Sequence, residues 1–211
     1  MSLDFRITGF FPSPVYNTKR DSNLDSTEKK EIENIIKEGL RKTGALDHYT
    51  DNTYIFNTKL KNLKKFCEQH IKNYVKEVFN PKEEIDFYIT QSWINVIEPG
   101  GNIQAHWHSN SIISGVFYIS AEEGDTITFG DPNMKLKDMI QFDPIEYNIW
   151  NTFNGSIPSR NNELILFPSW LEHSVNSNEK ATTDRISISF NTFAKGIFGD
   201  LKNGLNELTL K

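Results

Sequence analysis

The sequence predicts a mainly β fold of the α+β class, in which two N-terminal helices buttress a β-sandwich or jelly roll. Helical periodicity is confined to residues 25–80, and short β-rich runs separated by turn signals follow over residues 85–195. The spacing of these runs suits a sandwich or jelly roll rather than a parallel sheet with intervening helices. We expect residues 1–211 to form one domain, with a helical support region at 25–80 and a β core at 85–195.

Two amphipathic helices are expected in the first part of the chain. The first begins at Asp25 or Ser26, both residue types that favour a helix N-cap, and ends near Gly44. The second runs from about Thr58 to Phe79 and ends at Asn80-Pro81. Apolar residues recur along both at helical spacing: Ile32, Ile35, Ile36 and Leu40 in the first, and Leu60, Leu63, Phe66, Cys67, Ile71, Tyr74, Val75 and Val78 in the second.

Five strands are expected after Pro81, each rich in β-branched and aromatic residues. Gly and Pro close several of the runs, as they do at the end of many strands. The Asn154-Gly155-Ser156 segment is interpreted as a turn, and so is Pro99-Gly100-Gly101-Asn102. The five expected strands are Ile85–Ile97, Ile112–Ser120, Thr126–Phe129, Glu163–Phe167 and Arg185–Phe193.

Composition excludes several classes of partner and site. Lys and Arg total 23 against 28 Asp and Glu, a formal charge of −5, so we expect neither a nucleic acid nor an anionic membrane as partner. Cys67 is the single cysteine, which rules out a disulfide framework and a thiolate zinc cluster. No stretch approaches about 18 apolar residues, so we expect a cytoplasmic protein.

Three of the five histidines lie where they can bind a metal together. In His106-Trp107-His108 the two imidazoles are two residues apart, so an extended segment would direct both to the same side. His173 follows the fourth expected strand and would supply a third imidazole. A His-x-His pair alone is equally typical of an exposed polar strand edge, and the third histidine favours a metal site.

Arg185 strengthens the metal-site interpretation. It lies 12 residues after His173, and a hairpin centred near Glu179 would place the two residues opposite one another. A planar guanidinium matches a carboxylate bidentately, so Arg185 would hold one end of a small diacid while the other end chelates the metal. Ser187 faces the same way and would add a hydroxyl group. The alternative is an arginine at a strand start that pairs with a surface acid.

A set of motifs, taken in their order along the chain, resembles the motifs of the 2-oxoglutarate/Fe(II)-dependent dioxygenases. More narrowly, it is similar to the prolyl-hydroxylase-like oxygenases of phages and marine bacteria, which would admit a phage-encoded protein. The resemblance spans nearly the whole chain. Its motifs are Phe10-Phe11-Pro12-Ser13-Pro14-Val15-Tyr16, His106-x-His108, Ser114-Gly115-Val116-Phe117-Tyr118-Ile119, Leu166-Phe167-Pro168-Ser169-Trp170 with His173, Arg185-Ile186-Ser187, and Phe190-Asn191.

The resemblance implies a double-stranded β-helix, which is a jelly roll, and an Fe(II)- and 2-oxoglutarate-dependent hydroxylase that releases succinate and CO2. His106 and His173 would be iron ligands. His108 stands where the family usually has a carboxylate, so the third ligand here would be an imidazole. An imidazole at that position also argues against the halogenating relatives, which keep a small residue there.

The resemblance also assigns a cosubstrate pocket. Arg185 and Ser187 would hold the distal carboxylate of 2-oxoglutarate, and Tyr118 would donate a hydrogen bond to the same group. Trp93 and Asn95 lie two apart on the preceding strand and are candidates to line the pocket, with core packing favoured for Trp93.

Alternatives exist for the third ligand and for the function. Asp125 or Asp131 would supply a carboxylate from a neighbouring strand, and a shifted pair of His108 with Asn110 is a further option. We favour the three histidines. The alternative functions are a cupin-type three-histidine metalloenzyme that does not use 2-oxoglutarate, and a non-catalytic jelly-roll binding protein. Loops around residues 133–161 are expected to select the substrate, a small molecule or a peptide.

Overall fold

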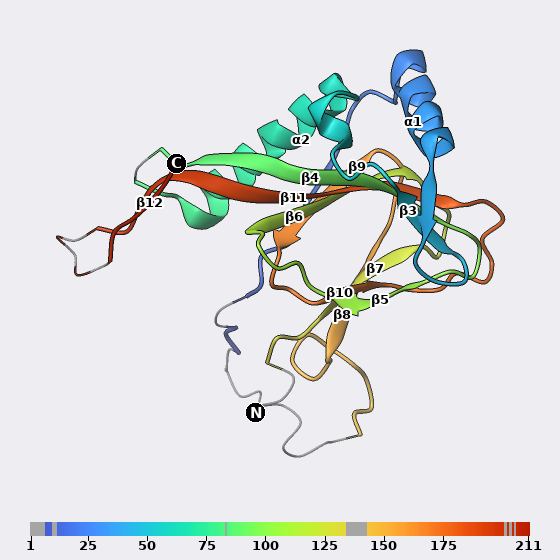
Figure 1. Ribbon diagram of the computed structural model, residues 1–211. Helices are drawn as coiled ribbons and strands as arrows, with labels where there is room; N and C mark the ends of the chain where they lie inside the picture. Colours follow the sequence, from blue (N-terminus) through green and yellow to red (C-terminus); the bar gives the residue numbers. More distant parts are fainter. Residues whose placement is uncertain are drawn as a thin grey trace.

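The computed structural model describes residues 7–9, 12–82, 84–133, 143–200, 202, 204 and 206–211. Within these ranges two antiparallel sheets face one another as two layers, and the helices lie on the outer side of the larger sheet (Figure 1). The prediction of a mainly β protein built from antiparallel sheets is therefore confirmed. Among the described helices, none has the length and apolar character needed to cross a bilayer.

The larger sheet is built around two long strands, β4 and β11. They pair antiparallel from Arg185 opposite Ile97 to Lys195 opposite Asp86. The strand order is β1-β9-β6-β11-β4-β3-β2, with β12 paired to the far end of β11. The strands are β1 (Tyr16–Lys19), β2 (Leu40–Lys42), β3 (Asp47–Thr50), β4 (Asp86–Ile97), β6 (Ile113–Ser120), β9 (Glu163–Pro168), β11 (Arg185–Phe198) and β12 (Leu208–Leu210).

The smaller sheet has the order β5-β10-β7-β8 and lies below the larger one in Figure 1. Its edge strand β5 ends at His106, and β10 begins at His173. These two histidines are direct register partners, and His173 also lies opposite Phe129 on β7. The strands are β5 (Ile103–His106), β7 (Thr126–Gly130), β8 (Asn154–Pro158) and β10 (His173–Val175).

Helix α1 (Ser26–Glu38) begins where the sequence predicts and ends earlier. Asp25 forms a capping box: its Oδ1 accepts the backbone N–H of Glu28 at 2.8 Å, and Glu28 Oε2 accepts the Asp25 N–H at 3.0 Å. The expected end near Gly44 is wrong, because Gly39 has a φ of 154° and the chain leaves the helix there to enter β2.

Helix α2 (Lys61–Tyr74) begins three residues after the expected start. A 3-10 turn, η1 (Ile55–Asn57), and a left-handed Leu60 with φ of 54° occupy that part of the chain. A π-helical turn, η2 (Val75–Phe79), continues α2 and ends at Asn80, as predicted.

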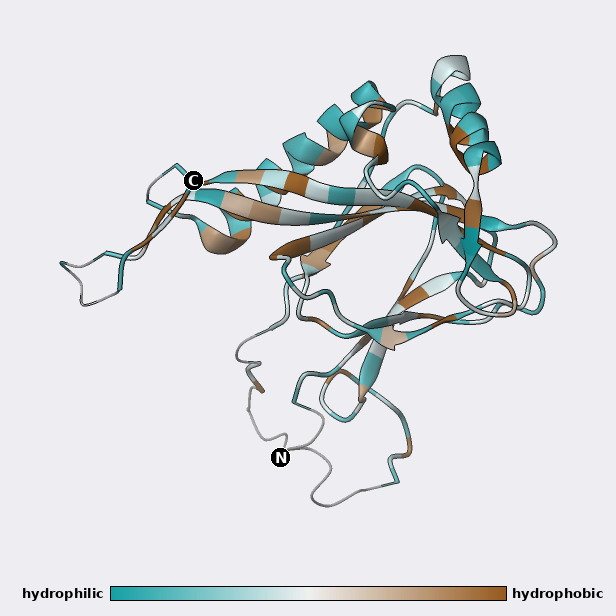
Figure 2. Cartoon of the chain, in the orientation of Figure 1, coloured by the Kyte–Doolittle hydropathy of each residue, from teal (hydrophilic) through white to brown (hydrophobic). Residues whose placement is uncertain are grey.

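Two hydrophobic clusters hold the layers together. One lies between the helices and the larger sheet, and the apolar faces of α1 and α2 point towards it (Figure 2). The other lies between the two sheets and includes Val116, Tyr118, Ile127 and Phe167. Successive residues of β6 serve both clusters, since Phe117 faces the helices while its neighbours face the smaller sheet. Burying one large apolar side chain contributes about 1.5–3 kcal/mol.

The five expected strands appear as β4, β6, β7, β9 and β11, with ends within a residue or two except for β11, which continues to Phe198. The turn expected at Asn154-Gly155-Ser156 is wrong. These residues open β8, because Gly155 pairs with Phe129 and Ser156 with Thr128 at the edge of the smaller sheet. Of the 133–161 region expected to select substrate, residues 134–142 lie outside the described part of the chain.

Candidate metal centre

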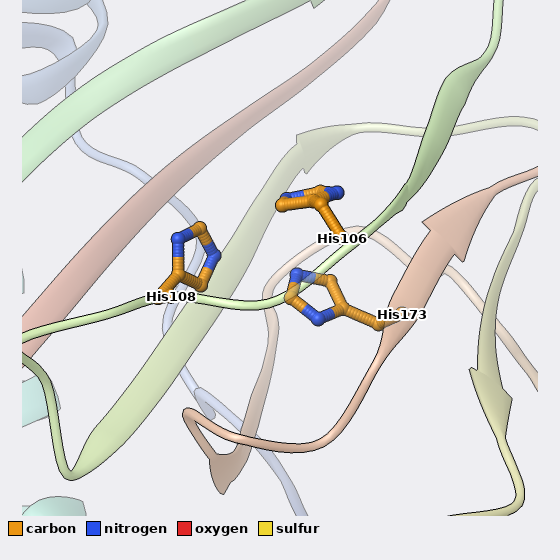
Figure 3. A group of neighbouring side chains, drawn as sticks. All are labelled: His106, His108 and His173. Atoms are coloured by element: carbon orange, nitrogen blue, oxygen red, sulfur yellow. The ribbon is translucent and has the colours of Figure 1, made fainter.

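Three imidazoles converge between the two sheets (Figure 3). His106, His108 and His173 each offer a ring nitrogen, and these atoms all lie within 4.8 Å of one another. The ring centroids are 4.3 Å apart for His106 and His173, 5.0 Å for His106 and His108, and 5.1 Å for His108 and His173. Such a separation leaves room for one ion that binds all three.

The strand register brings the three residues together. His106 and His173 lie opposite one another where β5 pairs with β10. His108 follows two residues later, and its backbone N–H donates to Ser169 O at 2.9 Å. This bond ties the segment after β5 to the segment before β10, so the chain turns His108 back towards the other two rings.

Two of the rings are oriented by backbone carbonyl groups. His106 Nδ1 lies 2.8 Å from Gln104 O, and His173 Nδ1 lies 3.0 Å from Leu171 O. A carbonyl oxygen only accepts, so each Nδ1 carries the hydrogen and donates it. The Nε2 lone pair of each ring is then free, which is the tautomer that a metal requires.

Burial keeps the rings neutral. His173 is 6% exposed, and its burial lowers the pKa of the imidazole to about 3. Burial, with the nearby His106, lowers the pKa of His108 to about 4. A protonated imidazole cannot ligate a metal, so at neutral pH these two rings keep the lone pairs that a cation needs.

The other candidate ligands lie elsewhere. The cluster contains neither Asp125 nor Asp131. The Asp125 carboxylate is buried and accepts a hydrogen bond from Arg185 Nη1 at 3.1 Å. Asn110 lies in a turn with φ of 57°, and its side chain is exposed. His70 is on α2 and bonds Tyr16, away from the cluster.

The cluster opens into a cavity of about 890 Å³. Tyr118, Arg185 and Ser187 line the same cavity as the three histidines. Tyr118 on β6 and Ser187 on β11 are register partners, and Arg185 begins β11, so these residues approach the cavity from the larger sheet. The imidazoles approach it from the smaller sheet and the segment that follows β5.

The hairpin that the sequence analysis expected between His173 and Arg185 is wrong. His173 pairs with β5 and β7 in the smaller sheet, while Arg185 pairs with β4 in the larger one. The segment between them crosses from one sheet to the other. Both residues still line one cavity, but they do so from opposite walls.

Arg185 is buried, with 4% of its surface exposed, and it is only partly satisfied. Nη1 donates to Asp125, and both Nη atoms reach Asn176 O at 3.4 Å. Nε is buried and has no hydrogen-bond partner among the described residues. Burial lowers the pKa of Arg185, and the nearby Asp125 opposes this effect. An orphaned buried N–H is costly, so it marks a place where a ligand acceptor belongs.

Tyr118 and Trp93 differ in how they face the cavity. Tyr118 is buried, and its burial raises the pKa of the phenol to about 12, so the hydroxyl remains a donor. Trp93 belongs to neither hydrophobic cluster and lines the cavity, so the preference for a packing role is wrong. Its Nε1 donates to Asn95 Oδ1 at 3.0 Å, and Asn95 Nδ2 donates to Ser189 Oγ at 2.8 Å.

Sequence reasoning missed the partner of Arg185. Asp125 was considered only as a possible metal ligand, although an inward-facing arginine in an apolar strand needs a counter-charge. The carboxylate that supplies it lies 60 residues earlier in the chain. The need of a buried arginine for an acidic partner was the signal available in the sequence. Only the topology shows that Asp125 is that partner.

Comparisons with known proteins concern the family and the fold. Residues 91–191 match the family described as "Putative 2OG-Fe(II) oxygenase". No curated protein sequence matches the chain. Among solved structures, a prolyl-4-hydroxylase from Pseudomonas putida is similar with 12% sequence identity and a TM-score of 0.57, over 87% of this chain and 94% of that one.

Two further structures show the same likeness. The non-heme alpha ketoglutarate dependent carbocyclase SnoK from nogalamycin biosynthesis has 14% identity and a TM-score of 0.59, over 87% of this chain and 81% of that one. HygX from Streptomyces hygroscopicus, with nickel, 2-oxoglutarate and hygromycin B bound, has 10% identity and a TM-score of 0.52, over 85% and 82%.

The structure thus combines a mainly β fold with a cluster of three imidazoles suited to one metal ion. Residues 91–191, slightly under half of the chain, match a family of 2-oxoglutarate/Fe(II)-dependent oxygenases, and the similar solved structures share the fold.

Proposed function

We propose that this protein is an Fe(II)- and 2-oxoglutarate-dependent oxygenase that hydroxylates a small molecule. The observation that carries the proposal is the convergence of three imidazoles on one cavity that also contains a buried arginine with an unpartnered Nε. Hygromycin B, which is bound in the HygX structure, is a small molecule and supports this choice of substrate class.

His106, His108 and His173 would hold the iron. The donor set fits the ion, because imidazole suits iron and the Nδ1–H groups of His106 and His173 are already engaged by backbone carbonyl groups. The chain's part is to present three neutral nitrogens from fixed directions, so that iron binding requires little reorganisation.

Arg185, Ser187 and Tyr118 would bind the distal carboxylate of 2-oxoglutarate. The fit is supported by the orphaned Nε of Arg185 and by the Tyr118 hydroxyl, whose raised pKa keeps it a donor. Each group donates a hydrogen bond, as an incoming carboxylate requires.

When bound, iron and 2-oxoglutarate supply the oxidation of a substrate C–H bond, coupled to formation of succinate and CO2. The protein would orient both, and Trp93, whose Nε1 is fixed on Asn95 Oδ1, offers an aromatic face beside His108 for the substrate. Trp93 lies with its ring centroid 6.1 Å from that of His108.

The remaining expectations are part of the same proposal. We infer that residues 1–211 act as one jelly-roll domain, with α1 and α2 as supports for the sheet that carries Arg185. The contacts of both helices with the larger-sheet cluster support this role. No nucleic-acid partner is expected from the net charge of −5. A cytoplasmic place is supported by the buried, unpaired Cys67. Membership of the phage and marine-bacterial prolyl-hydroxylase-like group stays a prediction.

The proposal is tested by adding Fe(II) and then 2-oxoglutarate to metal-free protein without oxygen, while recording the visible spectrum. We expect a charge-transfer band of the chelated 2-oxo acid only when both are present. The His173→Ala variant should lose both the band and the bound iron, because it removes a ligand. The His70→Gln variant is the matched control, since His70 lies on α2 outside the cluster.

Each other outcome favours a different function. Bound iron without a band would favour a three-histidine metalloenzyme that does not use 2-oxoglutarate. Absence of both iron and band in the wild-type protein would favour a non-catalytic binding protein. Full iron binding by His173→Ala would remove His173 from the site.

A further inference from the structure

We propose that Asp125 is a positioning residue that holds the Arg185 guanidinium in the orientation needed to receive the distal carboxylate of 2-oxoglutarate. The inference rests on the proposed function and concerns a residue outside the iron and cosubstrate contacts. Asp125 immediately precedes β7 and Arg185 begins β11, so their ion pair joins the smaller sheet to the larger one.

The Asp125 carboxylate is itself fixed in place. It is 3% exposed, and both of its oxygens accept hydrogen bonds. Oδ1 accepts from Arg185 Nη1 at 3.1 Å and from Asn178 Nδ2 at 3.2 Å, and Oδ2 accepts from the backbone N of Glu122 at 2.8 Å. A buried carboxylate held by three donors cannot rotate freely, so it is a rigid anchor for the arginine.

The contact with Asp125 leaves the Nε donor of Arg185 unused. Nη1 is engaged by Asp125, and Asn176 O lies at a longer 3.4 Å from Nη1 and Nη2. Because the guanidinium is planar, fixing Nη1 also fixes the direction of Nε–H. That atom is buried without a partner among the described residues, and Arg185 lines the cavity. Asp125 therefore binds Nη1 of the guanidinium and leaves the Nε–H group available to donate to a carboxylate.

A neighbouring acid fixes the backbone that leads into Arg185. The Glu122 carboxylate accepts the backbone N–H groups of Thr182 at 3.1 Å and Thr183 at 2.8 Å. Glu122 and Asp125 belong to the same turn between β6 and β7. This turn thus holds the guanidinium of Arg185 through Asp125. It also holds the backbone just before Arg185 through Glu122, so both ends of the arginine are fixed by one turn.

The test is the Asp125→Asn variant, which keeps the shape of the side chain and removes its charge. We would measure the Kd of 2-oxoglutarate for the iron-loaded protein from the charge-transfer band, and the iron affinity separately. The Kd should rise about tenfold, because a charge-assisted contact is lost, while the iron affinity stays unchanged. In an Arg185→Ala background, Asp125→Asn should cause no further rise, since its partner is absent.

The matched control is Glu28→Gln. Glu28 is another buried carboxylate, 3% exposed, that pairs with an arginine, Arg20, at 3.0 Å, but it caps α1 far along the chain from β11. It should lose stability as Asp125→Asn does and keep the wild-type Kd. If Asp125→Asn fails to fold, Asn178→Ala removes one donor to the same Oδ1 atom, and we expect a rise of about two- to threefold.

An unchanged Kd in Asp125→Asn, or in Asn178→Ala where that variant replaces it, would overturn the inference while leaving the proposed function intact. An equal rise in the Arg185→Ala background would also overturn it, because Asp125 would then act independently of Arg185. A wild-type protein that forms no band would overturn the proposed function and this inference together, and that result is seen before any variant is made.

Discussion

At the scale of single residues, the third imidazole sets this centre apart from a site of two histidines and one carboxylate. Three neutral imidazoles leave the full +2 charge of a bound Fe(II) uncompensated by its protein ligands, whereas a carboxylate would reduce the charge by one. His108 sits beside Trp93 and is held through its own backbone bond to Ser169 O.

Replacement of His108 by Asp tests its place in the site. We expect His108→Asp to bind Fe(II) as tightly as the wild-type protein or more tightly, because the carboxylate adds an anionic ligand. His108→Ala should lose at least about tenfold in affinity, since one ligand is removed. Anaerobic Fe(II) titration measures both. If the two variants bind iron equally well and as the wild type does, His108 is not a ligand.

At the scale of elements, periodicity predicted the long strands and both helices but not the short strands that carry the ligands. β5 and β10 have four and three residues, too few for an alternating pattern to emerge. The turn-rich stretch after His173 fits a hairpin and a crossover between sheets equally well, and only the pairing of β10 with β7 decides for the crossover. The histidines were predictable from their types and spacing. The Asp125 contact was not, because topology alone joins residues 60 apart.

Strand β6 is tightly packed at Gly115, and this packing gives a testable prediction. A Cβ atom there would lie 2.2 Å from Phe190 Cζ and 2.8 Å from Leu166 Cδ2, both on neighbouring strands. We expect Gly115→Ala to lower the free energy of unfolding by about 1–3 kcal/mol, as overpacked cores do. Urea denaturation measures this change.

Gly155 on β8 provides the matched control for that experiment. A Cβ atom there meets nothing within 4 Å, so Gly155→Ala should change the free energy of unfolding by less than about 0.5 kcal/mol. Equal effects of the two variants would show that the close contact at Gly115 relaxes at no cost.

At the scale of the whole molecule, the two halves of the site belong to different sheets. The imidazoles come from β5, β10 and the segment after β5, while Arg185, Ser187 and Tyr118 come from β11 and β6. A metal and a diacid bound together would therefore cross-link the layers. A ligand that binds only the folded state raises the free energy of unfolding, and the rise grows with the logarithm of the ratio of ligand concentration to Kd.

Thermal unfolding measures this cross-link. Nickel is used in place of iron in this experiment so that oxygen causes no turnover, and the HygX structure also contains nickel together with 2-oxoglutarate. We expect Ni(II) to raise the Tm, and 2-oxoglutarate to raise it further only when Ni(II) is present. Arg185→Ala should keep the rise caused by the metal and lose the part caused by 2-oxoglutarate. Loss of both parts in Arg185→Ala would mean that the arginine supports the fold rather than the cosubstrate.

Part of the cavity lining comes from residues that are not proposed to bind iron or 2-oxoglutarate. Residues 43–47, in the hairpin between β2 and β3, and residues 100–105, before and along β5, also line the cavity, whereas the iron and carboxylate contacts are proposed for other positions. Mutations at these lining residues are therefore distinct from mutations at the residues proposed to bind iron and 2-oxoglutarate. Exchange of residues 43–47 would therefore change the lining of the cavity without replacing any residue proposed to hold iron or 2-oxoglutarate.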